Sequence, residues 1–322
     1  MILINPKKDV ITTNALVVGM SGHYRVRTIN KFSGNCRLDT GWFDNKLLTS
    51  GLNVMATEAS WLTHCQVGTD NTLPSDSDTS LLGYVSGTSD IQSTTNGQQG
   101  ASPYYGWKRH TYRFAAGTVA ANLSEVGVGW GSSGSTLVSR ALIIDPVTQN
   151  PTTITPLSDE LLDVTYELRY YPPTSDVSGP QVTLDGVVYD TTTRAAEVTS
   201  SFWSANIGTK IGHLATALSD WAAYDGTLGT IRQNPNGVAA DCDTSTLQYD
   251  GSYSNNSFEM MVGVPVGISG WNLAGGIRSI RIRTTAGSYQ TEFSSNPGGS
   301  TIPKDTLHTM NMQWIVNWSE KT

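Results

Sequence analysis

Hydrophobic and polar residues alternate along several stretches of this chain, and an alternation with a period of two is typical of a half-buried β-strand. The clearest alternation covers residues 309–318, and similar patterns cover residues 163–171, 23–29 and 280–293. A short, fully apolar stretch at residues 141–144 predicts a strand that is buried on both faces. The side chains predicted to face the core are Tyr24, Val26, Val164, Tyr166, Leu168, Tyr170, Met310, Met312, Trp314, Val316 and Trp318.

Two local signals concern the segments between these strands. An Asp-Gly pair at residues 185–186 separates the β-forming residues 182–184 from residues 187–189, and both members of such a pair tolerate the positive φ of a tight hairpin turn. In residues 207–222, apolar positions recur at the spacing of an amphipathic helix, although two glycines weaken the pattern. We therefore predict a hairpin at the first site and a helix at the second.

The composition favours strands over helices. Only 15% of the residues are charged, compared with roughly 25% in typical soluble domains. Ser, Thr, Asn and Gly take their place, and these residues suit strands and turns. We expect an all-β fold of antiparallel β-sandwich domains with at most one or two short helices. Within it, we expect an N-terminal attachment segment (1–60), a β-sandwich domain (61–173) and a second β-rich domain that is distal and exposed (174–322).

The net charge and the spacing of the cysteines exclude several classes of function for this chain. A net charge of −7 argues against a protein that binds nucleic acid, because such proteins need clustered Lys and Arg. No apolar stretch has the character of a secretory signal or the length to insert into a membrane. Cys36, Cys65 and Cys242 are too far apart in the sequence for a zinc motif or a disulfide framework. We expect neutral thiols in a chain that folds in a reducing cytoplasm.

No stretch has the residue types and spacing of a catalytic or metal-binding motif. Residues 131–135 (Gly-Ser-Ser-Gly-Ser) do not match the Gly-x-Ser-x-Gly of a serine nucleophile. Asp70, Asp76 and Asp78 lack the spacing of a calcium loop, so we expect a solvated turn there. The carboxylates at 159–160 would suit half of a glycosidase pair, but exposed carboxylates are the commoner case. We therefore predict no catalytic residue, no metal site and no bound cofactor.

Several aromatic residues fall in polar stretches of the second half of the chain. Tyr and Trp serve as interface anchors because they bury a large area at low entropic cost, and sugars also bind to aromatic faces. For a protein that assembles, the subunit interface is the commoner use. The aromatic residues that we predict to contact another subunit or a receptor are Trp203, Trp221, Tyr224, Tyr249, Tyr253 and Trp271.

Three stretches resemble a pattern that recurs in tail-fibre-like and other tail-associated proteins of tailed bacteriophages. In residues 65–82, Val-Gly-Thr is followed by a proline and then by Asp-Thr-Ser-Leu. The second stretch is residues 122–130 (NLSEVGVGW), followed by residues 139–143 (SRALI). The third is residues 153–157 (TITPL), which lead into residues 162–168 (LDVTYEL).

This resemblance covers roughly residues 40–173 and implies a β-sandwich with a structural role in the virion, without catalytic residues to carry over. It implies a non-enzymatic tail component (tail tip, baseplate or fibre) that docks on other tail proteins and contacts a glycan or receptor of the bacterial surface. Tail fibres and spikes are commonly trimers, so it also implies a homotrimer, located in the virion and assembled in the host cytoplasm. The alternatives are a capsid decoration, head-fibre or collar protein, a carbohydrate-binding module, and a surface-polysaccharide hydrolase.

Overall fold

The computed structural model describes residues 8–184, 186–211, 220–243, 253–296 and 298–321. Strands dominate this part of the chain, and they form three sheets. Its helical elements are short: the α-helix α1 (Thr49–Val54) and the 3-10 turn η1 (Ser201–Trp203). The all-β fold class with few short helices is therefore confirmed.

The first sheet is 8-stranded, in the order β17 (Glu259–Val266), β20 (Thr309–Glu320), β1 (Lys8–Asn30), β11 (Glu160–Tyr171), β8 (Tyr105–Phe114) and β7 (Ile91–Gln99), with β2 (Cys36–Asp39) and β3 (Phe43–Asp44) also paired to β1. The second is 5-stranded, in the order β4 (Lys46–Leu47), β10 (Leu137–Leu142), β9 (Glu125–Gly129), β5 (His64–Gly68) and β6 (Tyr84–Thr88). The third is 7-stranded, in the order β12 (Val177–Ser178), β14 (Val187–Ala196), β19 (Gly287–Ser295), β18 (Ser279–Thr284), β15 (Trp221–Tyr224) and β16 (Ala239–Asp241), with β13 (Val182–Leu184) paired to β14.

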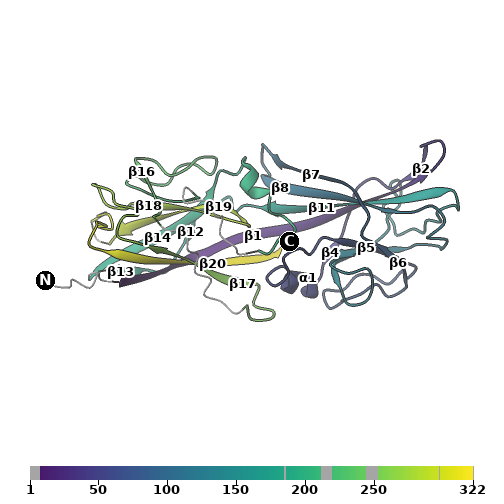
Figure 1. The fold of residues 1–322 in the computed structure, drawn as a ribbon, viewed down its shortest axis with the longest axis horizontal. Helices are drawn as coiled ribbons and strands as arrows, with labels where there is room; N and C mark the ends of the chain where they lie inside the picture. Colours follow the sequence, from purple (N-terminus) through teal and green to yellow (C-terminus); the bar gives the residue numbers. More distant parts are fainter. Residues whose placement is uncertain (1–7, 185, 212–219, 244–252, 297, 322) are drawn as a thin grey trace.

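Strand β1 runs through both halves of an elongated molecule (Figure 1). From Lys8 to Met20 it pairs in parallel with β20, and from Gly19 to Asn30 it pairs antiparallel with β11. Its 23 residues span about 70 Å at the usual rise of a strand. Every second residue from position 16 to position 28 is buried, so one face of β1 contributes to the core along this whole stretch.

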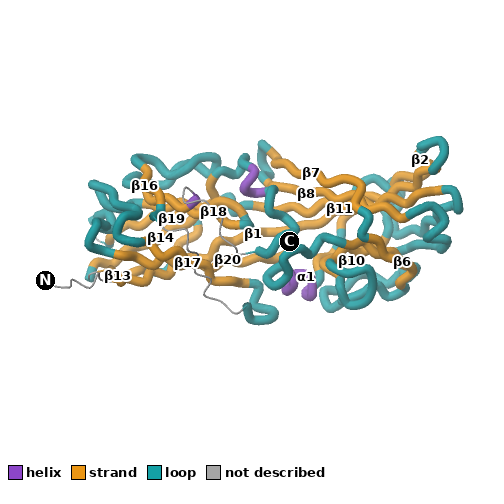
Figure 2. The backbone as a smooth tube through the Cα atoms, viewed as in Figure 1, coloured by secondary structure: helices purple, strands orange, loops and turns teal. Residues whose placement is uncertain are grey.

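The two other sheets each cover one half of the first sheet, which gives two β-sandwiches end to end (Figures 1 and 2). In one half, the Tyr24 hydroxyl on β1 lies 2.6 Å from the Ser139 hydroxyl on β10. In the other half, the indole N–H of Trp314 on β20 donates to the Thr291 hydroxyl on β19 at 3.3 Å. The inner faces of both sandwiches therefore combine tight apolar packing with paired polar groups.

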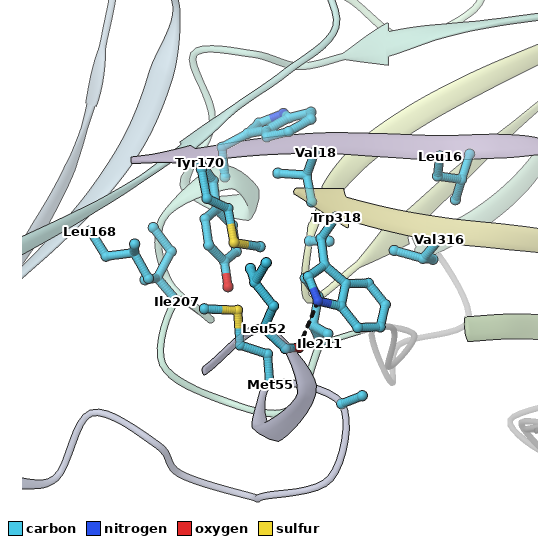
Figure 3. Close-up of a cluster of buried hydrophobic side chains, with 14 of the residues drawn as sticks. Leu16, Val18, Leu52, Met55, Leu168, Tyr170, Ile207, Ile211, Val316 and Trp318 are labelled. Carbon is cyan, nitrogen blue, oxygen red and sulfur yellow. Dashed lines mark hydrogen bonds between the residues drawn. The ribbon is translucent and has the colours of Figure 1, made fainter. Parts of the chain in front are cut away.

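The hydrophobic core continues from one sandwich into the other without a break. At the junction, Leu52 and Met55 of the α1 region pack beside Tyr170 and Trp318 (Figure 3). The indole N–H of Trp318 donates to the carbonyl oxygen of Leu52 at 2.8 Å. This bond fastens α1 to the end of β20, so the junction is a packed part of the core.

The structural units do not follow the ranges 1–60, 61–173 and 174–322. Residues 8–54 supply strands that pair with both β11 and β20, as well as α1. A boundary at residue 60 therefore falls inside the first sandwich. Strand β11 ends at Tyr171, and every strand of the third sheet follows it in the sequence. The attachment role of residues 1–60 stays a prediction.

The strand predictions agree with the structure except at residues 141–144, where β10 ends at Leu142. The helix prediction does not hold where it can be compared. Strands β13 and β14 pair as the predicted hairpin, although residue 185 itself lies outside the described residues. Residues 212–219 of the predicted helix also lie outside them. At its described ends, residues 207–211 form turns and a single β-bridge, and Trp221 begins strand β15.

His110 on β8 is a partly buried histidine beside the core. Its ring centre lies 5.9 Å from that of Tyr112, and the ammonium group of Lys108 on the same strand donates to the Ile207 carbonyl oxygen at 2.8 Å. Burial, and after it the positive charge of Lys108, lower the pKa of His110 from 6.5 to about 4. The folded protein therefore keeps this side chain neutral at a pH where an exposed histidine is protonated.

The unfolding free energy should fall as the pH is lowered from 6.5 to about 4, because the unfolded chain binds a proton at residue 110 that the folded protein does not. We expect His110 to contribute about 1–3 kcal/mol to this loss, since the ring is only partly buried. The variant His110→Gln is neutral in both states and should give a flatter profile in urea unfolding over the same pH range. Burial also lowers the pKa of His23, but that effect is common to both proteins. Parallel profiles would contradict the prediction.

Candidate functional site

An open groove of about 800 Å³ lies where the two sandwiches meet. Helix α1 and the loop between β5 and β6 line it from one sandwich, together with Trp130 at the end of β9. Tyr253 and Asn255 line it from the other. Figure 2 shows α1 near the middle of the molecule, close to the end of β20. Clefts between structural units are common binding sites, which makes this groove the candidate functional site.

The groove depends on a close approach of α1 to β10. A Cβ atom on Gly51 would lie 2.3 Å from the carbonyl oxygen of Val138, so a larger residue would push the helix away. The first residue of α1, Thr49, donates its backbone N–H to the Asp76 carbonyl oxygen at 2.9 Å. The Ser50 hydroxyl donates to the Leu137 carbonyl oxygen at 3.0 Å. These bonds satisfy polar groups at a helix start that lacks a side-chain cap.

Asn53 joins the two walls of the groove. Its side-chain oxygen accepts hydrogen bonds from the Tyr253 hydroxyl at 2.6 Å and from the Asn256 backbone N–H at 2.7 Å. Its side-chain N–H group donates to the Asn256 side-chain oxygen at 2.8 Å. Asn256 has a φ of 67°, in the left-handed region that Asn tolerates better than most residues. Burial raises the pKa of Tyr253, which keeps its hydroxyl available as a donor.

A buried ion cluster holds the β5–β6 loop, which lies beside α1 on the same wall of the groove. Arg140 on β10 is fully buried, and its Nε lies 2.7 Å from the Glu125 carboxylate, which is also fully buried. The same guanidinium lies 2.8 Å from Asp78 and 3.5 Å from Asp70. Glu125 also accepts the backbone N–H of Gly83 at 2.6 Å. The β5–β6 loop is thus fixed at its beginning, its middle and its end.

The predicted solvated turn agrees with the exposure of residues 71–73 and 75–77, but the prediction missed the ion pairs of Asp70 and Asp78. Both pair with Arg140, which lies more than sixty positions away in the sequence and so gave no local signal. Asp76, which lines the groove, pairs instead with the Lys46 ammonium at 2.7 Å. Asp76 and then Glu320 raise the pKa of Lys46, so the charge on Asp76 stays partly compensated.

Most of the aromatic residues that were predicted to be contact residues lie in the core. Trp203, Trp221 and Trp271 are 0% exposed and Tyr224 is 6% exposed, so these four predictions are wrong. The sequence around them is polar, but long-range packing encloses them; for example, the Trp271 indole N–H donates to the Trp221 carbonyl oxygen at 3.2 Å. Tyr253 alone of the described candidates reaches the groove, and Tyr249 lies outside the described residues.

Asn53 was not among the residues predicted to make contacts, and Trp130 was covered only by the resembling stretch 122–130. Asn53 gives no recognisable signal, because its partner Tyr253 is 200 positions away. Trp130 does give one: it stands directly before the Gly- and Ser-rich residues 131–135. A large aromatic residue next to a tight turn is placed at the end of a sheet, where one side of its ring can stay accessible.

No protein-family model matches the chain, and comparisons with curated proteins and with solved structures find no similar protein. Within the described ranges, no group of three or more His, Cys, Asp and Glu side chains is arranged to hold a metal ion. Among the helices of those same ranges, none has the length and apolar character to cross a membrane. The functional proposal therefore rests on the groove and the ion cluster.

Replacing Arg140 by Met should lower the unfolding free energy by about 3–5 kcal/mol, because the change leaves the buried Glu125 carboxylate without its partner. The double variant Arg140→Met with Glu125→Gln should recover part of this loss, since the fully buried charge of Glu125 is then removed, whereas Asp70 and Asp78 keep some contact with solvent. Urea unfolding of the two variants and of the wild type measures both effects. Equal stabilities of the single variant and the wild type would show that the ion cluster does not hold the loop.

Proposed function

We propose that this chain is a non-enzymatic structural protein of a tailed-bacteriophage virion, a tail component that docks on other tail proteins and faces the host surface. The positions of the three resembling stretches in the fold support this proposal. They include β5, β9 and β10, which are neighbours in the second sheet, and β11, which belongs to the first sheet of the same sandwich.

Four charged residues of the first two stretches come together in one cluster. Asp70 and Asp78 belong to the first stretch, Glu125 to the second, and Arg140 to the continuation of the second. A closed, buried cluster of this kind fixes the position of a loop and offers no free group for catalysis. The residues that carry the resemblance therefore build a scaffold, as a structural role requires.

The shape of the molecule also supports a structural role. Because β1 passes through both sandwiches and one core fills them, the protein is an extended body without a flexible linker between its halves (Figure 1). Such a body holds two surfaces at opposite ends at a fixed distance. That property suits a tail component, which must connect other tail proteins with the host surface.

Strand β7 is the edge that we propose for contacts between subunits. It is 9 residues long (IQSTTNGQQ) and contains neither a proline nor a charged residue. The opposite edge strand of the same sheet, β17, contains Pro265, and the edge strands of the other sheets are 2 to 5 residues long. Proteins usually protect long edges with charges, proline or a covering element. An unprotected edge that docks on another surface of the next copy can close a homotrimer.

Light scattering coupled to size exclusion should give a mass near three times 34.6 kDa for the wild type. Ser93→Lys places a charge on β7 and should shift the protein towards a single chain, because a lysine on an edge strand opposes further pairing. Thr174→Lys adds the same charge on the exposed loop between β11 and β12, outside β7, and should keep the trimer. A monomeric wild type would rule out the trimer for the free protein.

The virion assignment is tested on intact particles of the phage that encodes the chain. Gold-labelled antibodies raised against the purified protein should bind the tail in electron micrographs, and mass spectrometry should detect the chain in the purified particles. Label on the head would favour the capsid-decoration alternative. Particles without the chain would rule out a structural role in the virion.

A further inference from the structure

Most of the described residues that line the groove at the junction carry no charge. Apart from Val54 and the aromatic residues Trp130 and Tyr253, the described part of the lining consists of Ser, Thr and Asn residues and one acid, Asp76. The Lys46 ammonium lies 2.7 Å from Asp76 and also 2.7 Å from Glu320, so it offsets only part of the negative charge. Since the lining residues that the structure describes include no Lys, Arg or His, phosphate and carboxylate ligands have no charged partner among them.

The polar lining matches ligands that carry many hydroxyl groups. Hydroxyl and amide side chains can both donate and accept hydrogen bonds, and sugar hydroxyls do the same. In the groove, the Thr79 hydroxyl donates to the Ser135 hydroxyl at 3.2 Å, which leaves each of them further capacity. Ser77 and Asn255 are exposed at the same site. A neutral polyhydroxylated ligand could thus replace water on several of these groups.

The aromatic side chains supply the apolar part of such a site. Trp130 comes from the first sandwich and Tyr253 from the second, and both are half-buried. The ring of Tyr253 is stacked on Trp318 with centroids 5.7 Å apart, and its hydroxyl is held by Asn53. These two contacts hold the Tyr253 ring in one position. A ring that is already held loses little conformational entropy when it packs against the C–H face of a sugar.

We propose that this groove binds a neutral oligosaccharide, with Trp130 and Tyr253 packing against sugar rings and the Ser, Thr and Asn side chains bonding to their hydroxyls. A groove of about 800 Å³ is large enough for several sugar units, as drug-sized ligands occupy roughly 300–1,000 Å³. This inference names a ligand class for the contact with the host surface that is proposed above, and its biological role rests on that proposed function. The binding chemistry itself belongs to the isolated protein.

The test is isothermal titration calorimetry of the full chain with defined hexasaccharides. The neutral probes are the hexamers of α-1,4-linked glucose, β-1,4-linked mannose and β-1,4-linked N-acetylglucosamine, and the charged probe is the hexamer of galacturonic acid. We expect at least one neutral hexamer to bind and the charged hexamer to bind more weakly. No binding of any neutral hexamer, or stronger binding of the charged one, would overturn the proposal.

Variants locate the binding in the groove. Trp130→Ala and Asn255→Ala should each weaken the binding of the neutral hexamer, by about tenfold for the tryptophan. Trp42→Ala is the matched control, because Trp42 is 40% exposed and lies outside the groove; it should bind as the wild type does. Thermal unfolding confirms that each variant is folded. Unchanged binding in both groove variants would place the sugar elsewhere and overturn the assignment.

The outcome is independent of the virion experiment. Antibody labelling of particles can succeed while the neutral hexamers fail to bind, which would leave a structural protein without a sugar site. Conversely, the hexamers can bind in the groove while purified particles lack the chain, which would leave a carbohydrate-binding module outside the virion.

Discussion

One strand has to fit two sandwiches at once, and the rest of the structure depends on this constraint. Strand β1 pairs with β20 along its first part and with β11 along its second, and Gly19 and Met20 pair with both neighbours. Side chains alternate strictly along a strand, so a slip of one residue would turn the buried face of β1 outwards in both sandwiches. The register of one sandwich therefore fixes the register of the other. This coupling is why the ends of the molecule behave as parts of one body.

The junction follows from the same constraint, because elements of both sandwiches must pack closely around the middle of β1. Gly106 on β8 is one such place: a Cβ atom there would lie 1.9 Å from the Trp203 carbonyl oxygen of η1. On the groove side, Trp318 holds α1 and Asn53 holds residues 253–256. The two walls of the groove thus keep their relative position without a ligand. Preorganisation of this kind lowers the entropic cost of binding.

The sequence predicts those parts of this fold that depend on local patterns. The alternation of residue types at 163–171 and 309–318 identifies β11 and β20. Burial alternates along β20 from Met312 to Trp318, whereas residues 162–168 of β11 are buried on both faces, where Asp163 and Glu167 pair with arginines. Prediction from local patterns fails where a side chain is buried by distant parts of the chain. Trp203, Trp221 and Trp271 sit among polar neighbours in the sequence, yet all three are enclosed. Exposure of an aromatic side chain is set by what packs over it, and the composition around it does not report that.

Long-range packing also explains why the sequence predicts only part of the candidate site. The two polar features of that site, the Arg140 ion cluster and the neutral lining of the groove, differ in how fully their groups are paired. The guanidinium of Arg140 is occupied on every side, by Glu125, Asp78 and the Thr72 carbonyl oxygen, so it has no capacity left for a ligand. The next residue after Asp78, Thr79, belongs to the groove, and its side-chain hydroxyl donates to the Ser135 hydroxyl at 3.2 Å. Along this loop, charged groups that are fully paired inside give way to neutral groups that are partly satisfied at the surface. Because the charged contacts fix the backbone, the neutral ones can stay available for binding at little cost in stability.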